Sequence, residues 1–130
     1  MKYALFFGII AFFVFCIYRM FATSTEDNTV ANILAKNPLV LDVRTPEEFS
    51  KGHLEGSVNL PLDELENGAQ LTLDHKRPIL TCCSHGVRSI RAAKLLQMKG
   101  YKNAVDGGAW TNLQIIRDKH PLAATAVEQK

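Results

Sequence analysis

An uncharged, wholly apolar stretch at residues 3–18 constrains this 130-residue chain more than any other feature. A helix on the surface of a soluble domain shows a polar face at helical spacing, and this stretch shows none. The stretch therefore lies outside any water-soluble core, and the folding unit is the part of the chain from about Asn28 onward. That part has about 100 residues, which is enough for one domain with one hydrophobic core.

Two interpretations of the apolar stretch stay open: an uncleaved membrane anchor and a secretory signal peptide. Residues 20–22 extend the stretch toward the ~20 residues of a membrane span, provided that Arg19 reaches the membrane interface. Residues 22–24 have the small-x-small pattern of a signal-peptidase site, so a cleaved form is the alternative. The length of the stretch favours an anchor over residues 1–22.

The charges that flank the apolar stretch only weakly determine on which side of the membrane the domain lies. Lys2 and Arg19 flank the apolar stretch and nearly balance under the positive-inside rule. We expect the N-terminus inside and the domain on the periplasmic or extracytoplasmic side. Residues 23–28 are polar and predict a linker, which leaves residues 29–130 as the globular domain.

The charge of the globular part argues against a nucleic-acid partner. The chain has 15 basic and 13 acidic side chains, but Lys2 and Arg19 flank the apolar stretch and every acidic residue follows Phe21. Without those two basic residues the globular part is formally neutral. Nucleic-acid binding requires a basic excess on one face, so we expect none.

Strand signals alternate with helix signals through the rest of the chain. Short apolar runs of the kind found in buried parallel strands occupy residues 39–43, 57–60, 78–82 and 104–105. Helices are predicted to begin near Val30, Thr45, Pro61, Ser89 and Ala109. The first turn of the second of these carries a capping box formed by Thr45 and Glu48. This alternation predicts an α/β domain with a mainly parallel sheet.

The three cysteines, Cys16, Cys82 and Cys83, form neither a disulfide framework nor a zinc site. Cys16 lies in the apolar stretch, and no paired CxxC or Cys/His spacing occurs. The adjacent pair Cys82 and Cys83 therefore needs another explanation.

The segment at residues 83–89, CSHGVRS, follows a predicted buried strand and precedes a helix. Sites in open α/β sheets form at the carboxyl ends of strands, where loop N–H groups and a helix N-terminus lower the pKa of a cysteine. Gly86 lets the loop curl so that its N–H groups point inward. Arg88 supplies a positive charge for an anionic substrate. The segment predicts an oxyanion pocket beside the nucleophilic sulfur of Cys83.

Four segments in order resemble the sequence elements of the rhodanese family. They are the CxxGxRS loop at residues 83–89, the "DVR…EF" element at 42–49, the "GHIPGAINIP" element at 52–61, and the "GG" before the last helix at 107–108. Together they cover roughly residues 36–112. The short layout behind an export-like segment is similar to that of the phage-shock periplasmic rhodaneses. The resemblance implies a rhodanese-like three-layer domain behind an N-terminal membrane-spanning helix.

The resemblance also implies a single-domain sulfurtransferase of the thiosulfate sulfurtransferase type. Cys83 would be the catalytic nucleophile, taking a sulfane sulfur from thiosulfate or a related small anionic donor as a persulfide. A thiol, an acceptor protein or cyanide would then remove that sulfur. The residues that the resemblance assigns to substrate binding are Ser84, His85, Gly86, Val87, Arg88 and Ser89. It implies no metal and no organic cofactor.

Cys82 keeps a second interpretation open. Counted from Cys82, Arg88 completes C-x5-R, the longer spacing of Cdc25-like phosphatases and arsenate reductases, which share this fold. Gly86 favours the shorter loop, because relative to Cys83 it stands where the sulfurtransferase loop has its glycine. Cys82 would then be a strand-end residue in the core. A non-catalytic rhodanese-like binding module is disfavoured, because the cysteine, glycine and arginine are all present.

Other polar and aromatic residues are predicted to support the fold. We expect Arg44 to form an ion pair with Glu48 near the edge of the sheet. We expect His53 and Asn59 to make hydrogen bonds that stabilise the fold, and Trp110 to pack in the core.

Overall fold

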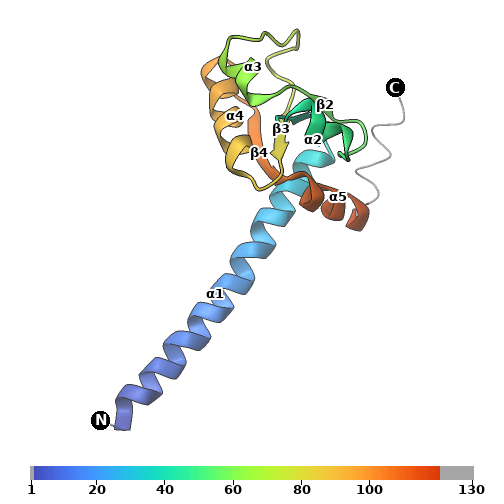
Figure 1. Ribbon diagram of the computed structural model, residues 1–130. Coiled ribbons are helices and arrows are strands. Elements are labelled where there is room, and N and C mark those ends of the chain that lie inside the picture. The colour runs from blue at the N-terminus through green and yellow to red at the C-terminus, as the bar shows by residue number, and fades with distance from the viewer. Residues whose placement is uncertain (1, 121–130) are drawn as a thin grey trace.

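The computed structural model describes residues 2–120, and it begins with one long helix, α1 (Lys2–Leu34). Most of α1 projects from the domain as a stalk (Figure 1). Its segment Tyr3–Ala22 is long and apolar enough to cross a membrane, and none of it is buried against the protein. The predicted linker at residues 23–28 is helical, and the helix predicted near Val30 is the last part of the same helix α1. No glycine or proline interrupts the chain there, and the helix ends only near Asn37 (φ 53°) and Pro38.

The last turns of α1 belong to the domain. Leu34 is buried, with 6% of its surface exposed, and Val30, Ala31 and Ile33 are partly buried. They pack with residues of α5 (Trp110–Lys119), among them Leu113, so the stalk is continuous with the core.

A four-stranded sheet forms the middle layer, with strand order β2-β1-β3-β4. The strands are β1 (Leu39–Asp42), β2 (Val58–Asn59), β3 (Ile79–Cys83) and β4 (Ala104–Ala109). Every pair is parallel, which confirms the predicted α/β fold with a parallel sheet. Gly107 lets β4 approach β3, because a Cβ at this position would lie 2.7 Å from the carbonyl oxygen of Thr81.

Helices cover both faces of the sheet. On one face lie α3 (Leu62–Glu66) and α4 (Val87–Met98), while the end of α1 and α5 cover the other. The short helix α2 (Pro46–Ser50) begins with the predicted capping box, in which Thr45 and Glu48 bond each other's backbone N–H groups. Successive side chains of β3 enter opposite layers, so Cys83 joins the α4 layer and Cys82 joins the α1/α5 layer.

The carboxyl ends of the strands meet at one edge of the sheet. Cys83 ends β3 at this edge, and a short loop leads from it to α4. In Figure 1 this loop lies on the side of the domain where the N-terminal part of α1 projects.

Candidate active site

Cys83 is the last residue of β3, and only 1% of its surface is exposed. Its Sγ accepts a hydrogen bond from the backbone N–H of Gly86 at 2.9 Å and lies 3.5 Å from Oγ of Ser89. Gly86 has a φ of 90°, a left-handed conformation that glycine adopts with little strain. The loop therefore folds back over the sulfur, and α4 begins directly after it.

The surroundings of Cys83 favour its thiolate. Burial alone would raise the pKa of this thiol, because a buried thiolate is poorly solvated. A hydrogen bond with the Ser89 hydroxyl, together with those from the backbone N–H groups of Ser89, His85 and Gly86, outweighs burial and holds the pKa below its ordinary value. The N-terminus of α4 adds the positive end of its dipole. Since the thiolate is the reactive form of cysteine, this geometry suits a nucleophile.

Arg88, in the first turn of α4, is held by Glu48 of α2. The two side chains share two hydrogen bonds, from Nη1 to Oε2 at 2.8 Å and from Nη2 to Oε1 at 3.1 Å. Arg88 and the backbone N–H of Thr45 lower the pKa of Glu48 to about 2, so the pair is fully charged at neutral pH. Arg88 also donates to Oγ of Ser84 at 3.4 Å. The arginine is thus fixed beside the cysteine loop, with part of its charge offset by a carboxylate.

A model of the rhodanese-like domain family matches residues 26–109 of this sequence, which is more than half of the chain. This chain belongs to the rhodanese-like domain family. The match contains the strand that ends in Cys83 and the whole loop up to Arg88.

Relatives of this rhodanese-like chain include two thiosulfate sulfurtransferases. GlpE of Shewanella oneidensis is 35% identical over 81 residues, which cover 58% of this chain and 78% of that protein. PspE of Escherichia coli is 29% identical over 80 residues, which cover 61% of this chain and 77% of that protein. The protein YrkF of Bacillus subtilis is 37% identical over 67 residues, but these cover 52% of this chain and only 36% of YrkF.

A solved structure described as a rhodanese with anions from E. coli has the same fold. It superposes with a TM-score of 0.52 at 29% identity, over 57% of this chain and 88% of that one. The chain is therefore a member of a sulfurtransferase family, with the α/β fold predicted from its sequence.

In this rhodanese-like domain Cys82 lies on the other side of β3. It is fully buried and packs in an apolar cluster that includes Leu54, Leu80 and Leu113. Burial above all, and then the nearby charge of Asp42, raises the pKa of its thiol. Cys82 is thus a neutral core residue, as its predicted packing requires, and its position gives no support to Cys82 as a nucleophile.

The predicted ion pair between Arg44 and Glu48 is wrong. Arg44 is buried and pairs with Asp42, with Nε 2.9 Å from Oδ1 and Nη2 2.7 Å from Oδ2. It also donates to the carbonyl oxygen of Gly52 at 2.8 Å and lies 5.1 Å from the ring centre of Trp110. Arg44 donates to the backbone carbonyl of Glu48 at 3.4 Å, and the Glu48 carboxylate pairs with Arg88 instead. The Asp42–Arg44 pair ties the end of β1 to the following loop.

The predicted structural roles of Asn59 and His53 are confirmed. The Asn59 amide donates to the carbonyl oxygens of Asp42 and Arg44, at 3.1 Å and 2.9 Å. Nδ1 of His53 lies 2.8 Å from the carbonyl oxygen of Phe49. Trp110 is partly buried against the α1/α5 layer. These contacts hold the loops around the carboxyl edge of the sheet.

The residues predicted to bind substrate fall into two sets. Four are buried or half-buried and share hydrogen bonds with Cys83 or with each other, namely Ser84, Gly86, Arg88 and Ser89. The side chains of His85 and Val87 are exposed, Val87 by 76%. The first set can shape an anion site, whereas the second lies on the outer surface of the loop.

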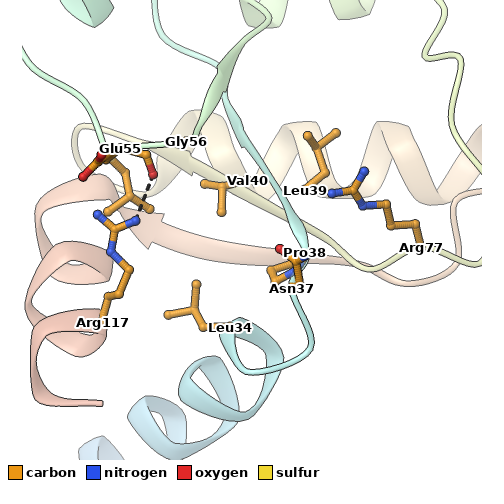
Figure 2. A pocket seen from close by; sticks show the side chains of 10 residues that line it. Leu34, Asn37, Pro38, Leu39, Val40, Glu55, Gly56, Arg77 and Arg117 are labelled. Carbon is orange, nitrogen blue, oxygen red and sulfur yellow. Dashed lines mark hydrogen bonds between the residues drawn. The ribbon is translucent and has the colours of Figure 1, made fainter. Parts of the chain in front are cut away.

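A pocket lies at the opposite, amino edge of the sheet (Figure 2). It is bordered by Leu34 at the end of α1, by Pro38 before β1, and by Arg117 of α5, which donates to the carbonyl oxygen of Glu55 at 2.8 Å. No residue of the cysteine loop lines it. Among the side chains that the structure describes, no group of His, Cys, Asp and Glu could hold a metal ion.

Proposed function

We propose that this chain is a thiosulfate sulfurtransferase, attached to a membrane by α1, that carries a sulfane sulfur on Cys83. The observation that supports this most directly is the 2.9 Å hydrogen bond from the Gly86 N–H to the Cys83 sulfur at the end of β3. A thiolate held by backbone donors is both stabilised and nucleophilic. Its similarity to two thiosulfate sulfurtransferases supports this substrate class.

In the first half-reaction the Cys83 thiolate attacks the outer sulfur of thiosulfate or a related anionic donor. A new S–S bond forms on Cys83, and the S–S bond of the donor breaks as sulfite leaves with its electron pair. The loop N–H groups then face the terminal sulfur of the persulfide. Arg88 holds the anionic donor, and Glu48 keeps that arginine in place.

In the second half-reaction an acceptor thiolate, or cyanide, attacks the terminal sulfur of the persulfide. The bond between the two sulfurs breaks, and Cys83 leaves as the thiolate that began the cycle. Sulfur changes carrier without an external oxidant or reductant.

The N-terminal segment supports attachment to a membrane. None of the segment Tyr3–Ala22 is buried inside the protein, so its apolar surface can face lipid. The domain then lies on the periplasmic or extracytoplasmic side. Carbonate washing of membranes should leave the intact chain in the pellet, and a soluble form that lacks residues 1–22 would show that the segment is a cleaved signal.

The mechanism is tested by incubating the full chain in detergent with thiosulfate and weighing its peptides by mass spectrometry. The peptide with Cys83 should gain one sulfur in the wild type and in Cys82→Ser, and should gain none in Cys83→Ser. Hydrolysis of p-nitrophenyl phosphate that depends on Cys82, without any sulfur transfer, would instead indicate the phosphatase-type loop.

A further inference from the structure

The direction of α1 fixes which side of the domain faces its membrane-spanning part. Leu34 and the start of β1 lie together at the amino edge of the sheet (Figure 2). From Leu34, α1 runs back across the α5 side of the sheet, so its N-terminal part emerges beyond the carboxyl edge (Figure 1). The loop between Cys83 and α4 lies at that carboxyl edge. The reactive sulfur and Tyr3–Ala22 are therefore on the same side of the domain.

The distance between the domain and the end of the apolar segment is short. Ala22 ends the candidate span, and Val30 is the first described side chain of α1 that packs on the core. Eight residues of helix separate them, a rise of ~12 Å at 1.5 Å per residue, which is about the diameter of one helix. Because α1 is one helix and its last turns are part of the core, the helix fixes this distance between the domain and the end of the apolar segment.

We propose that the cysteine loop faces the bilayer, and that the sulfur acceptor is a cysteine thiol of a membrane protein, presented close to the bilayer surface. This inference rests on the proposed function. A folded soluble protein is wider than a space of one helix diameter, whereas a small donor such as thiosulfate can diffuse into it. The acceptor thiolate attacks the outer sulfur of the Cys83 persulfide, the inner S–S bond breaks, and Cys83 is released as a thiolate.

The outer surface of the site fits a partner at the membrane. Val87 and Ile90, in the first turn of α4, expose 76% and 46% of their surfaces. The charge of Arg88 beside them is offset by Glu48. The rim of the loop thus offers apolar contacts and little net charge, which suits the apolar helix ends of a membrane protein.

The test uses the full chain in lipid nanodiscs, loaded with thiosulfate whose outer sulfur is radioactive. Three acceptors are compared: glutathione, a transmembrane peptide with one cysteine just outside its apolar segment, and a folded soluble protein with one exposed cysteine. We expect transfer to the peptide to be about tenfold or more faster than transfer to the soluble protein, because that protein cannot orient its thiol against the loop.

A variant with a longer α1 tests how the distance between the domain and the bilayer affects sulfur transfer. Inserting 18 helix-forming residues between Asp27 and Asn28 adds five turns, which raises the domain by ~27 Å without changing its rotation about α1. This variant should transfer sulfur to the soluble protein about tenfold faster than the wild type does, with its rate to glutathione unchanged. The matched control carries the same 18 residues after Lys130 and should behave as the wild type.

The outcomes separate this inference from the proposed function. If thiosulfate does not load Cys83, the proposed function fails and this inference fails with it. If loading and transfer to glutathione are normal but the wild type serves the peptide and the soluble protein equally, the orientation is wrong and the sulfurtransferase stands. An insertion without effect on the soluble protein would overturn the inference in the same way.

Discussion

Two adjacent residues of β3, Cys82 and Cys83, have the same side chain and opposite chemistry. One peptide unit separates them, yet strand alternation sends their sulfurs into different layers of the domain. Cys83 meets the N–H groups of a tight loop and the start of a helix, and its pKa falls. Cys82 meets leucine side chains, and its pKa rises. Whether a cysteine is reactive is thus decided by which face of the strand it occupies.

The test with the largest expected effect removes each of the two sulfurs in turn. Cys83→Ser should reduce thiosulfate:cyanide transfer by about a thousandfold or more, because it removes the thiolate proposed to carry the sulfur. Cys82→Ala should keep the activity within a few fold. Steady-state assays of both variants in detergent measure this, and comparable losses in both would end the distinction between the two faces.

A second test concerns the apolar side of β3. Cys82→Ser places a hydroxyl among leucine side chains, and an unmet hydrogen-bonding group there should lower the free energy of unfolding by about 1–3 kcal/mol. Cys82→Ala is the control for lost volume and should cost less. Urea titrations followed by the fluorescence of Trp110, the single tryptophan, compare the two. A serine as well tolerated as alanine would mean that Cys82 already has a polar neighbour.

A third test follows the thiolate of Cys83 as a function of pH. Iodoacetamide alkylation of Cys83 should rise with pH through a midpoint below the pKa of a free cysteine, because loop hydrogen bonds lower its pKa. Ser89→Ala removes one of those hydrogen bonds and should move the midpoint upward. Cys82 should stay unmodified in the folded protein. An unchanged midpoint in Ser89→Ala would mean that the backbone N–H groups alone lower the pKa of Cys83.

The smallest expected effect is that of the Arg88–Glu48 pair on stability. The pKa of Glu48 is lowered to about 2, so its contribution is complete above its unfolded-state pKa of ~4.5 and is lost as pH falls toward 2. Because 39% of the Glu48 side chain is exposed, solvent screens the pair and Glu48→Gln should cost less than ~1 kcal/mol at pH 7. Urea titrations from pH 7 to pH 3 should show this difference shrinking. A difference that grows in acid would contradict the assignment.

The parts of the fold that could be predicted from sequence rest on local signals. Short β-branched runs located the four strands, and Thr45 with Glu48 located a helix start. The CxxGxRS loop located the residues around Cys83, because its glycine and its helix start are both encoded within a few positions. The roles of these residues in sulfur transfer stay a prediction.

Local signals do not determine contacts between segments that are distant in the chain. Residues 23–28 are polar but contain nothing that breaks a helix, so α1 runs through them once both flanks are helical. Proximity in sequence predicts a pair between Arg44 and Glu48, whereas Glu48 binds Arg88, forty positions away. Such a partner depends on how α2 lies against α4, which only the folded sheet determines.

The continuous helix α1 also makes the direction of the domain sensitive to length. An α-helix turns by about 100° for each residue, because one turn takes ~3.6 residues. Deleting one residue between Ala22 and Val30 would therefore swing the domain about a quarter-turn around the stalk while lowering it by only ~1.5 Å. The length of α1 thus sets both the distance of the domain from the membrane and its rotation about the helix axis. A single insertion or deletion would turn the reactive sulfur toward a different neighbour in the membrane.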